Sequence, residues 1–277
     1  MFSYLICGQI NSRLNTDPLV YFQKLRNDLD DFEIIVSTWP NEISRNVYKY
    51  IDKIVITKDP GESKYGRNWE RILVSTGNAI SAASMQYIIR SRVEVVIKQP
   101  DLFKSLLFHN THHFESKIFF PYRISCYQYN KGLLFAWPDF FHIASKNMIS
   151  RYWNSDTAPT QNLPFHMTTK SINSLSSDQV LAANFTHSEY PIEYFDDKYY
   201  FSKKNWNNHY NIQKKYIVFF DENKFGLDFG RLARNSSSSR IALSKILFSK
   251  SGKTFQIIYL IIRFIKMRKR AYFLNKK

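Results

Sequence analysis

Residues 32–37 read FEIIVS, a short and mostly β-branched run that is followed at once by TWP at residues 38–40. An apolar run of this length that ends at a proline turn predicts a buried strand. Working outward toward the N-terminus, residues 2–6 (FSYLI) form another apolar run, which ends in the turn-like CGQ at residues 7–9. We therefore expect two buried strands in the first forty residues.

Helical segments alternate with these strands. Asp17 and Pro18 combine a capping side chain with a proline at the first helical position, and apolar residues recur with helical spacing from residue 19 to residue 29. Further along the chain we expect a short helix near residues 42–50, a strand over 53–57 and a longer helix over 69–85, followed by a strand over 87–97. This alternation predicts an α/β fold with a mostly parallel, Rossmann-type central sheet flanked by helices. Ligands of such sheets bind in the crevice at the carboxyl ends of the strands.

The second half is less regular. Strands are expected over residues 118–122 and 127–135 and at IVFF (217–220), and helices over 146–152 and 179–185. Four consecutive serines at residues 236–239 indicate a linker. With 277 residues and 44% hydrophobic content, the chain has material for one main domain and a small appendage.

The positive charge is concentrated at the C-terminus. Thirteen Lys and Arg residues and no Asp or Glu follow Asp228, so residues 1–228 carry only the remaining +3 of the formal charge of +16. Within this tail, FQIIYLIIRFI (255–265) is shorter than the about 20 apolar residues that span a bilayer, and it is followed by KMRKR (266–270). We predict a basic amphipathic helical tail that lies on an anionic membrane surface through residues 241–277. The alternative is a helix packed on the main domain.

The compartment is suggested by the cysteines and the N-terminus. Cys7 and Cys126 are the only cysteines, too few for a disulfide framework, and the sequence opens without a basic leader or a long apolar region. We therefore predict a cytoplasmic protein, peripheral on the inner face of the plasma (inner) membrane.

Three charged residues interrupt the apolar stretch 87–97. Because an unpaired buried charge is costly, Arg90, Arg92 and Glu94 should be paired with one another or face a crevice that holds an anion or a metal. An edge strand with one solvated face is the alternative.

A series of short motifs resembles the WavE lipopolysaccharide synthesis family. In chain order these are STW (37–39), DPG (59–61), NWER (68–71) and RSRVE (90–94), and the likeness continues through WPD (137–139) and DQ (178–179). It covers roughly residues 1–220.

The resemblance implies a GT-A-like glycosyltransferase that moves a sugar from a nucleotide-sugar donor to a lipopolysaccharide core, O-antigen or capsule acceptor. It implies a glycosyltransferase domain over residues 1–228, with a nucleotide-sugar-binding half (1–100) and an acceptor-binding half (101–228), followed by the tail (229–277). The donor-binding residues expected from it are Cys7, Gly8, Gln9, Ile10, Thr38, Trp39, Asp59, Asn68, Arg71, Arg90, Arg92 and Glu94.

The resemblance also implies a divalent cation, Mn²⁺ or Mg²⁺, held by an acidic motif after the fourth strand, because hard cations prefer oxygen ligands. Glu94 takes this position here, where the family usually has Asp, and the valines at positions 95 and 96 supply no second carboxylate. Either Glu94 anchors a metal with help from phosphate, or Arg90 and Arg92 hold the diphosphate directly, since guanidinium groups bind phosphate without a metal.

Two carboxylates are candidates for the catalytic base that accepts the proton of the acceptor hydroxyl. Asp178 occupies the position that supplies the base in similar transferases, although it can also be a helix cap. Asp139 can bind acceptor hydroxyls, with Trp137 and Phe140 stacking on the sugar.

Two other functions stay open at this point. The basic balance suggests a nucleic-acid-binding protein, but the confinement of the charge to the tail argues against it, and we expect no nucleic-acid partner. The missing second carboxylate suggests a catalytically inactive transferase-like assembly partner.

Overall fold

The structure is a computed structural model, and it describes residues 1–14, 16–61, 69–121, 137–153, 181–182, 185–190 and 203–229. Its centre is a seven-stranded sheet with the order β3-β2-β1-β4-β7-β6-β8. The strands are β1 (Phe2–Cys7), β2 (Glu33–Thr38), β3 (Lys53–Ile56), β4 (Tyr87–Ser91), β6 (Ile118–Pro121), β7 (Phe141–Ser145) and β8 (Ile217–Phe220). All pairings in this sheet are parallel except those of β7, which runs antiparallel to β4 and β6. The predicted α/β class with a mostly parallel sheet is confirmed.

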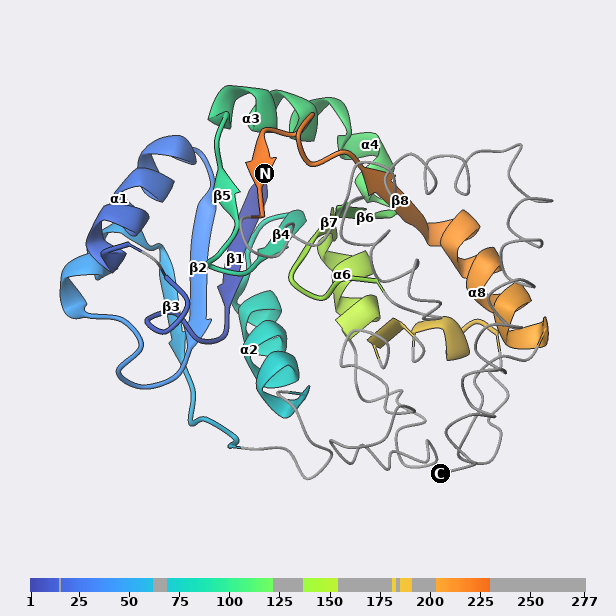
Figure 1. Cartoon of the computed structure of the whole chain (residues 1–277), viewed down its shortest axis with the longest axis horizontal. Coiled ribbons are helices and arrows are strands. Elements are labelled where there is room, and N and C mark those ends of the chain that lie inside the picture. Colours follow the sequence, from blue (N-terminus) through green and yellow to red (C-terminus); the bar gives the residue numbers. More distant parts are fainter. Residues whose placement is uncertain are drawn as a thin grey trace, which may run out of the picture.

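Helices cover both faces of the sheet (Figure 1). One core forms between the sheet and α1 (Pro18–Asp28), the 3₁₀ helix η1 (Arg45–Tyr50), α3 (Pro100–His109) and α4 (Thr111–Phe114). The opposite core forms against α2 (Trp69–Ala82), α6 (Lys146–Trp153) and α8 (Lys203–Tyr216). Alternate residues of β1 serve the two cores, Tyr4 and Ile6 the first and Leu5 and Cys7 the second, as the two-residue period of a strand requires.

The ends of α1 and α2 follow from local chemistry. The Asp17 carboxylate accepts a hydrogen bond of 2.7 Å from the Leu19 amide, and Pro18 occupies the first turn of α1, as predicted. At the C-terminal end of α2, the Lys53 ammonium donates to the Ala82 carbonyl at 2.8 Å and stabilises the helix terminus. The predicted helix over 69–85 therefore stops at Ala82.

The predicted strand over 87–97 is wrong beyond Ser91. The Val95 amide donates to the Arg92 carbonyl at 3.1 Å, which closes a turn immediately after β4. The chain then enters β5 (Val96–Ile97), which pairs with β9 (Leu227–Asp228) in a separate two-stranded sheet. Only Arg90 of the three charged residues thus belongs to the buried strand, whereas Arg92 and Glu94 lie in the turn.

Other elements differ from expectation or fall outside the described residues. The expected helix over 42–50 is a 3₁₀ helix that begins at Arg45, and α3, α8 and β7 were not predicted. The expected strand over 127–135, most of the expected helix over 179–185 and the tail from residue 230 onward lie outside the described residues. Within the described part of the chain, no helix is both long and apolar enough to cross a bilayer.

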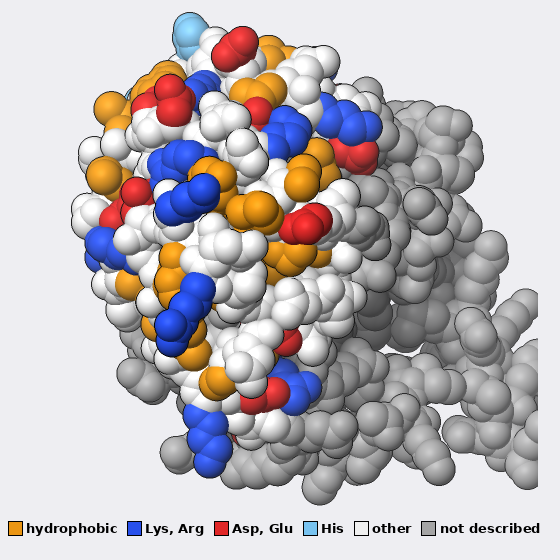
Figure 2. All heavy atoms as spheres, turned by 90° about the vertical axis from the view of Figure 1, so that its left-hand side faces the viewer, with side chains coloured by type: hydrophobic (Ala, Val, Ile, Leu, Met, Phe, Trp, Pro, Cys, Tyr) orange, Lys and Arg blue, Asp and Glu red, His pale blue; other side chains and the backbone are white. Residues whose placement is uncertain are grey.

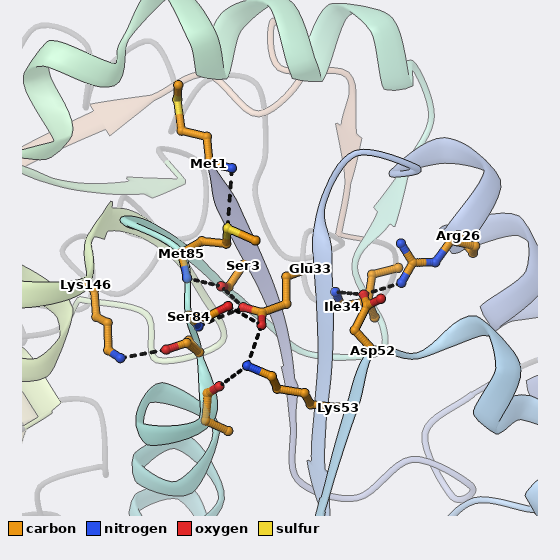
Figure 3. Close-up of polar contacts among 12 residues, drawn as sticks. Met1, Ser3, Arg26, Glu33, Ile34, Asp52, Lys53, Ser84, Met85 and Lys146 are labelled. Atoms are coloured by element: carbon orange, nitrogen blue, oxygen red, sulfur yellow. Dashed lines mark hydrogen bonds and ion pairs between the residues drawn. The ribbon is translucent and has the colours of Figure 1, made fainter.

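A buried carboxylate on β2 joins three other elements near the amino ends of β1, β2 and β3 (Figure 3). Glu33, 7% exposed, accepts hydrogen bonds from Ser3 and from the Ser84 amide and hydroxyl, at 2.9 and 2.6 Å for the two Ser84 groups. Its other partner is the Lys53 ammonium at 2.7 Å. Burial by itself raises the pKa of Glu33, but Lys53, Ser3 and Ser84 outweigh it and lower the pKa to about 2. The carboxylate therefore stays ionised and fixes β1, β2 and β3 to the end of α2.

Candidate active site

A cleft opens at the carboxyl ends of β1, β2 and β4, on the side of the sheet covered by α2. The side chains and backbone that line it come from four segments: Cys7, Gly8, Gln9 and Arg13; Trp39; Arg71, Ile72 and Ser75; and Arg90, Arg92 and Asp139. Four guanidinium groups and one carboxylate thus face the same space. The cleft lies where α/β sheets bind their ligands, as the sequence predicts.

The loop after β1 is fixed by contacts to β2 and to the segment that follows it. Gly8 has a φ of 97°, a conformation that L-residues rarely adopt, and its carbonyl accepts a hydrogen bond of 2.8 Å from the Thr38 hydroxyl. Further along the loop, the Glu42 carboxylate accepts from the amides of Ile10 and Asn11 at 2.8 and 2.9 Å. The backbone at the end of β1 is therefore held in place without a ligand.

Arg90 is the buried charge of the site. It is 2% exposed, and its Nη1 donates to the Asp139 carbonyl while the Trp153 ring lies 5.3 Å from the guanidinium carbon. Its Nε is buried without a hydrogen-bond partner among the described residues. Burial lowers the pKa of Arg90, and the same burial raises the pKa of the neighbouring Cys7 thiol, which therefore stays neutral.

The strand beside Arg90 carries no opposing charge. His142, its cross-strand partner, is fully buried and accepts a hydrogen bond of 2.7 Å from the Trp153 indole. Burial, and secondly the charge of Arg90, keep the pKa of His142 well below its ordinary value. Arg90 is thus the charged group at this point of the sheet.

Glu94 is bound by two arginines. Its Oε1 lies 3.1 Å from Nη1 of Arg13 and 2.8 Å from Nη2 of Arg92, and its Oε2 accepts from Nε of Arg92 at 3.1 Å. The Glu94 side chain is 6% exposed, whereas the two arginines are 30% and 21% exposed and line the cleft. Burial raises the pKa of Glu94, but Arg92 and Arg13 outweigh this and lower it. Glu94 is a carboxylate that holds two guanidinium groups at the cleft wall.

Asp59 and Arg71 form a second such pair. Nε and Nη2 of Arg71 donate to the two Asp59 oxygens, both at 2.7 Å, and the Gly61 amide donates to the same carboxylate at 3.0 Å. The hydrogen bond from Arg71 lowers the pKa of Asp59. The turn after β3 and the start of α2 are thereby joined, and Asp59 orients Arg71 toward the cleft rather than lining it.

Asp139 differs from the other carboxylates of the site. It reaches the cleft because β7 runs antiparallel to β4, so that the residues before β7 lie beside the end of β4; the Arg92 amide donates to the Phe140 carbonyl at 3.0 Å. No ion pair joins its carboxylate to any of the described side chains. A carboxyl group that lines a cleft in this way can exchange a proton with a ligand or bind its hydroxyl groups.

The described residues do not fit a divalent metal at Glu94. Its oxygens already accept from two positively charged groups, which a cation would have to displace or approach against repulsion. In the part of the chain that the structure describes, no group of three or more His, Cys, Asp or Glu residues is placed to hold a metal ion.

Several predicted site residues lie in or directly behind this cleft. Cys7, Gly8, Gln9, Trp39, Arg71, Arg90, Arg92 and Asp139 line it. Thr38, Asp59 and Glu94 stand behind the lining and bind residues or backbone that form it.

The other predicted residues are not brought into the cleft. Ile10 is fully buried in the core beneath the loop, Trp137 packs among aromatic side chains on the α6 face, and Phe140 packs against Phe229. Asn68 and Asp178 lie outside the described residues.

Sequence reasoning missed Arg13, Ile72 and Ser75 as lining residues, and Glu42 as the residue that fixes the loop. Ser75 lies one helical turn after Arg71 and donates to its carbonyl at 2.8 Å, so the helical spacing from the NWER motif was a usable signal. No comparable signal pointed to Arg13, because its partner is 81 positions away.

Comparisons with solved structures found distant similarities. A TarS fragment from S. aureus is 15% identical (TM-score 0.37) over 66% of this chain and 54% of that chain, and the bifunctional IspDF from Campylobacter jejuni is 14% identical (TM-score 0.31) over 66% and 46%. Mouse xyloside xylosyltransferase 1, in its apo form, is 12% identical (TM-score 0.38) over 86% and 99%. The chain spans about half the length of the first two, and similarities this distant support no argument about it.

No curated protein matches the sequence significantly. The family model described as WavE lipopolysaccharide synthesis, in contrast, matches residues 10–261, which is nearly the whole chain and includes every segment of the cleft except its first strand end. The predicted resemblance is thereby confirmed, and the protein belongs to the WavE lipopolysaccharide synthesis family.

Proposed function

We propose that the protein is a glycosyltransferase of the GT-A type, which moves a sugar from a nucleotide-sugar donor to a lipopolysaccharide core, O-antigen or capsule acceptor. The observation that carries this proposal is the composition of the cleft: guanidinium groups from three segments surround it, and Asp139 lines the same space with no ion pair to any of the described side chains. A cation-lined pocket with one available carboxylate suits an anionic donor and a neutral, hydroxyl-bearing acceptor. Family membership supports a role in lipopolysaccharide synthesis.

The donor half of the proposal rests on charge. When the bond from the sugar to the diphosphate breaks, negative charge accumulates on the leaving phosphate, and preorganised donors stabilise it most effectively in a site that excludes water. Arg71 and Arg92 are held by bidentate contacts to Asp59 and Glu94, so their positions are set before a ligand binds. Trp39, 5% exposed, forms part of the cleft wall and supplies an apolar contact for the nucleotide or the sugar.

The acceptor half rests on Asp139. We assign to it the role of the base that takes the proton from the attacking hydroxyl group of the acceptor as the new glycosidic bond forms. The Arg90 guanidinium donates a hydrogen bond to the Asp139 carbonyl and so fixes the backbone that carries this carboxylate at the cleft. Asp178 remains a second candidate for this role, and the acceptor-binding half over residues 101–228 belongs to the same proposal.

The tail and the location complete the proposal. We propose that residues 241–277 bind an anionic membrane surface and keep the enzyme on the cytoplasmic side of the inner membrane, near a lipid-linked acceptor. Figure 2 shows one face of the described part of the protein, where Lys and Arg side chains are interspersed with Asp, Glu and hydrophobic side chains. On this face, the described residues form no continuous basic stripe of the kind that nucleic-acid-binding proteins present.

The test is a donor screen with the full-length protein. UDP, GDP and CMP sugars are incubated with the protein, with and without Mn²⁺, and release of free nucleotide is measured together with transfer to lipopolysaccharide from a strain that lacks the protein. We expect one nucleotide class to be consumed and the sugar to appear in the acceptor. If no donor in the panel is bound or consumed under either condition, the proposal is refuted.

A further inference from the structure

Glu94 occupies the position from which the family implies a metal, yet its environment is that of an arginine-binding residue. Two guanidinium groups contact it, three separate N–O distances lie between 2.8 and 3.1 Å, and the side chain is 6% exposed. A divalent cation at this carboxylate would meet the positive charges of Arg13 and Arg92 within a few ångströms.

The arginines that surround the cleft already supply the charge that a metal would bring. Arg13, Arg71, Arg90 and Arg92 line it. Against these stand Asp139 in the lining and Glu94 and Asp59 behind it, so that the described residues of the site carry one positive charge in excess before any ligand binds. A diphosphate therefore enters a site that is net positive without a bound ion.

One of these arginines has unused hydrogen-bonding capacity. Arg90 is 2% exposed, and the described residues supply no acceptor to its Nε. A buried charged donor without an acceptor costs free energy, and the oxygens of an anionic ligand in the cleft would supply acceptors to the Arg90 guanidinium. Planar guanidinium groups match the spacing of phosphate oxygens and bind them in pairs.

We propose that this protein binds the diphosphate of its donor through Arg13, Arg92, Arg71 and Arg90 in place of a divalent cation, and that Glu94 is a positioning residue that holds the first two. This inference rests on the proposed function for the identity of the ligand, but it predicts an anion site whose existence is measured independently of turnover.

The probe is inorganic pyrophosphate, titrated into the full-length protein by isothermal calorimetry, once with excess EDTA and once with Mn²⁺. We expect binding in EDTA, with an affinity within about threefold of that measured with Mn²⁺. Arg13→Gln and Arg92→Gln should each weaken binding about tenfold or more, the usual consequence of losing a hydrogen bond to a charged group. Both side chains are partly exposed, so neither substitution removes core packing.

Arg45→Gln is the matched control, because Arg45 is exposed on η1 and outside the cleft lining. It should bind pyrophosphate like the unmodified protein, and thermal unfolding of all three variants without ligand should show that they are folded. Arg92→Lys separates charge from geometry: a lysine keeps the charge but cannot contact Glu94 and phosphate as a fork, so it should restore only part of the affinity.

Two results would overturn the inference: pyrophosphate binding that requires Mn²⁺, or Arg13→Gln and Arg92→Gln variants that bind as tightly as Arg45→Gln. The donor screen distinguishes this failure from that of the proposed function. Metal-dependent sugar transfer would support the proposed glycosyltransferase and refute the arginine site. Arginine-dependent pyrophosphate binding without consumption of any donor would support the arginine site and refute the proposed glycosyltransferase.

Discussion

Replacing Glu33 with Gln tests how much the buried carboxylate network contributes to the stability of the sheet. Glu33 is ionised and paired with Lys53, Ser3 and Ser84, and its pKa of about 2 lies well below the ordinary value of 4.5. At about 1.4 kcal/mol for each pH unit between the two values, the ionised group contributes about 3 kcal/mol to folding. A Gln side chain retains part of the hydrogen bonding, so we expect Glu33→Gln to lower the free energy of unfolding by about 2 to 3 kcal/mol at pH 7.

The sign of the pH dependence follows from the lowered pKa. The unfolded chain takes up a proton at Glu33 near pH 4.5, while the folded protein resists protonation until about pH 2. The contribution is therefore complete above pH 4.5 and is lost as the pH falls toward 2; at pH 3 less than half of it remains. The difference in the free energy of unfolding between the unmodified protein and Glu33→Gln should therefore decrease as the pH is lowered from 4.5 to 3.

Urea unfolding followed by tryptophan fluorescence at several pH values from 3 to 7 measures this difference. Asp28→Asn is the control, because the Lys24–Asp28 pair spans one turn of α1 at the surface, where such pairs contribute about 0.5 kcal/mol or less. A Glu33→Gln loss below about 1 kcal/mol at pH 7, or a loss that is the same at pH 3 and pH 7, would refute the reasoning from linkage.

Three further predictions concern the site and the loop beside β5. Asp139→Asn should reduce kcat for sugar transfer about 100-fold or more while thermal unfolding is unchanged, because an amide cannot accept the acceptor proton; near-normal kcat would remove Asp139 as the base. Asp59→Asn should lower both kcat and kcat/KM for the donor several-fold, since it releases Arg71 from the bidentate partner that positions it for the leaving phosphate, and steady-state kinetics with varied donor concentration measure the two parameters; an unchanged kcat would contradict this role of Arg71. Gly226→Ala should lower the free energy of unfolding by about 1 to 3 kcal/mol in urea titrations, because Gly226 has a φ of 64° and an added Cβ would lie 2.7 Å from Cβ of Gln99; an unchanged unfolding midpoint would contradict this.

The strands and helices of the first half were predictable because their signals are local. The apolar run at 32–37 and the proline after Asp17 act through propensity and capping within a few residues, and both elements lie where the sequence places them. The strand after residue 87 shows where local signals fail. The preference of Val93 and Val95 for extended structure predicts a strand, although both residues lie in or next to a turn. β4 ends at Ser91 because the chain turns there to pair with β9, more than 130 positions away, and no local signal reports that contact.

The chemistry of the site was predictable in part for the same reason. The charges that interrupt an apolar run marked Arg90, Arg92 and Glu94 as residues that must pair or face a ligand, and the structure places Arg90 and Arg92 in the cleft wall with Glu94 behind it, paired with Arg92. This pattern could not reveal that Glu94 also binds Arg13, because that contact depends on how the loop after β1 folds back over the end of β4. This tertiary contact adds a second guanidinium group to the one that Arg92 supplies locally, and the two together make Glu94 an arginine-binding residue.

The reversed direction of β7 explains how the four arginines and Asp139 come to line one cleft. In a fully parallel sheet the carboxyl ends of neighbouring strands would supply every functional group, and the segment before a strand would lie at the opposite edge. Because β7 is antiparallel to β4, the residue pair Ser91 and Phe141 lies side by side, and Asp139 arrives beside Arg90 and Arg92 from the start of its strand. The arginines therefore come from the first hundred residues and the carboxylate from the second half of the chain, and the proposed donor-binding and base groups meet in one cleft because β7 is reversed.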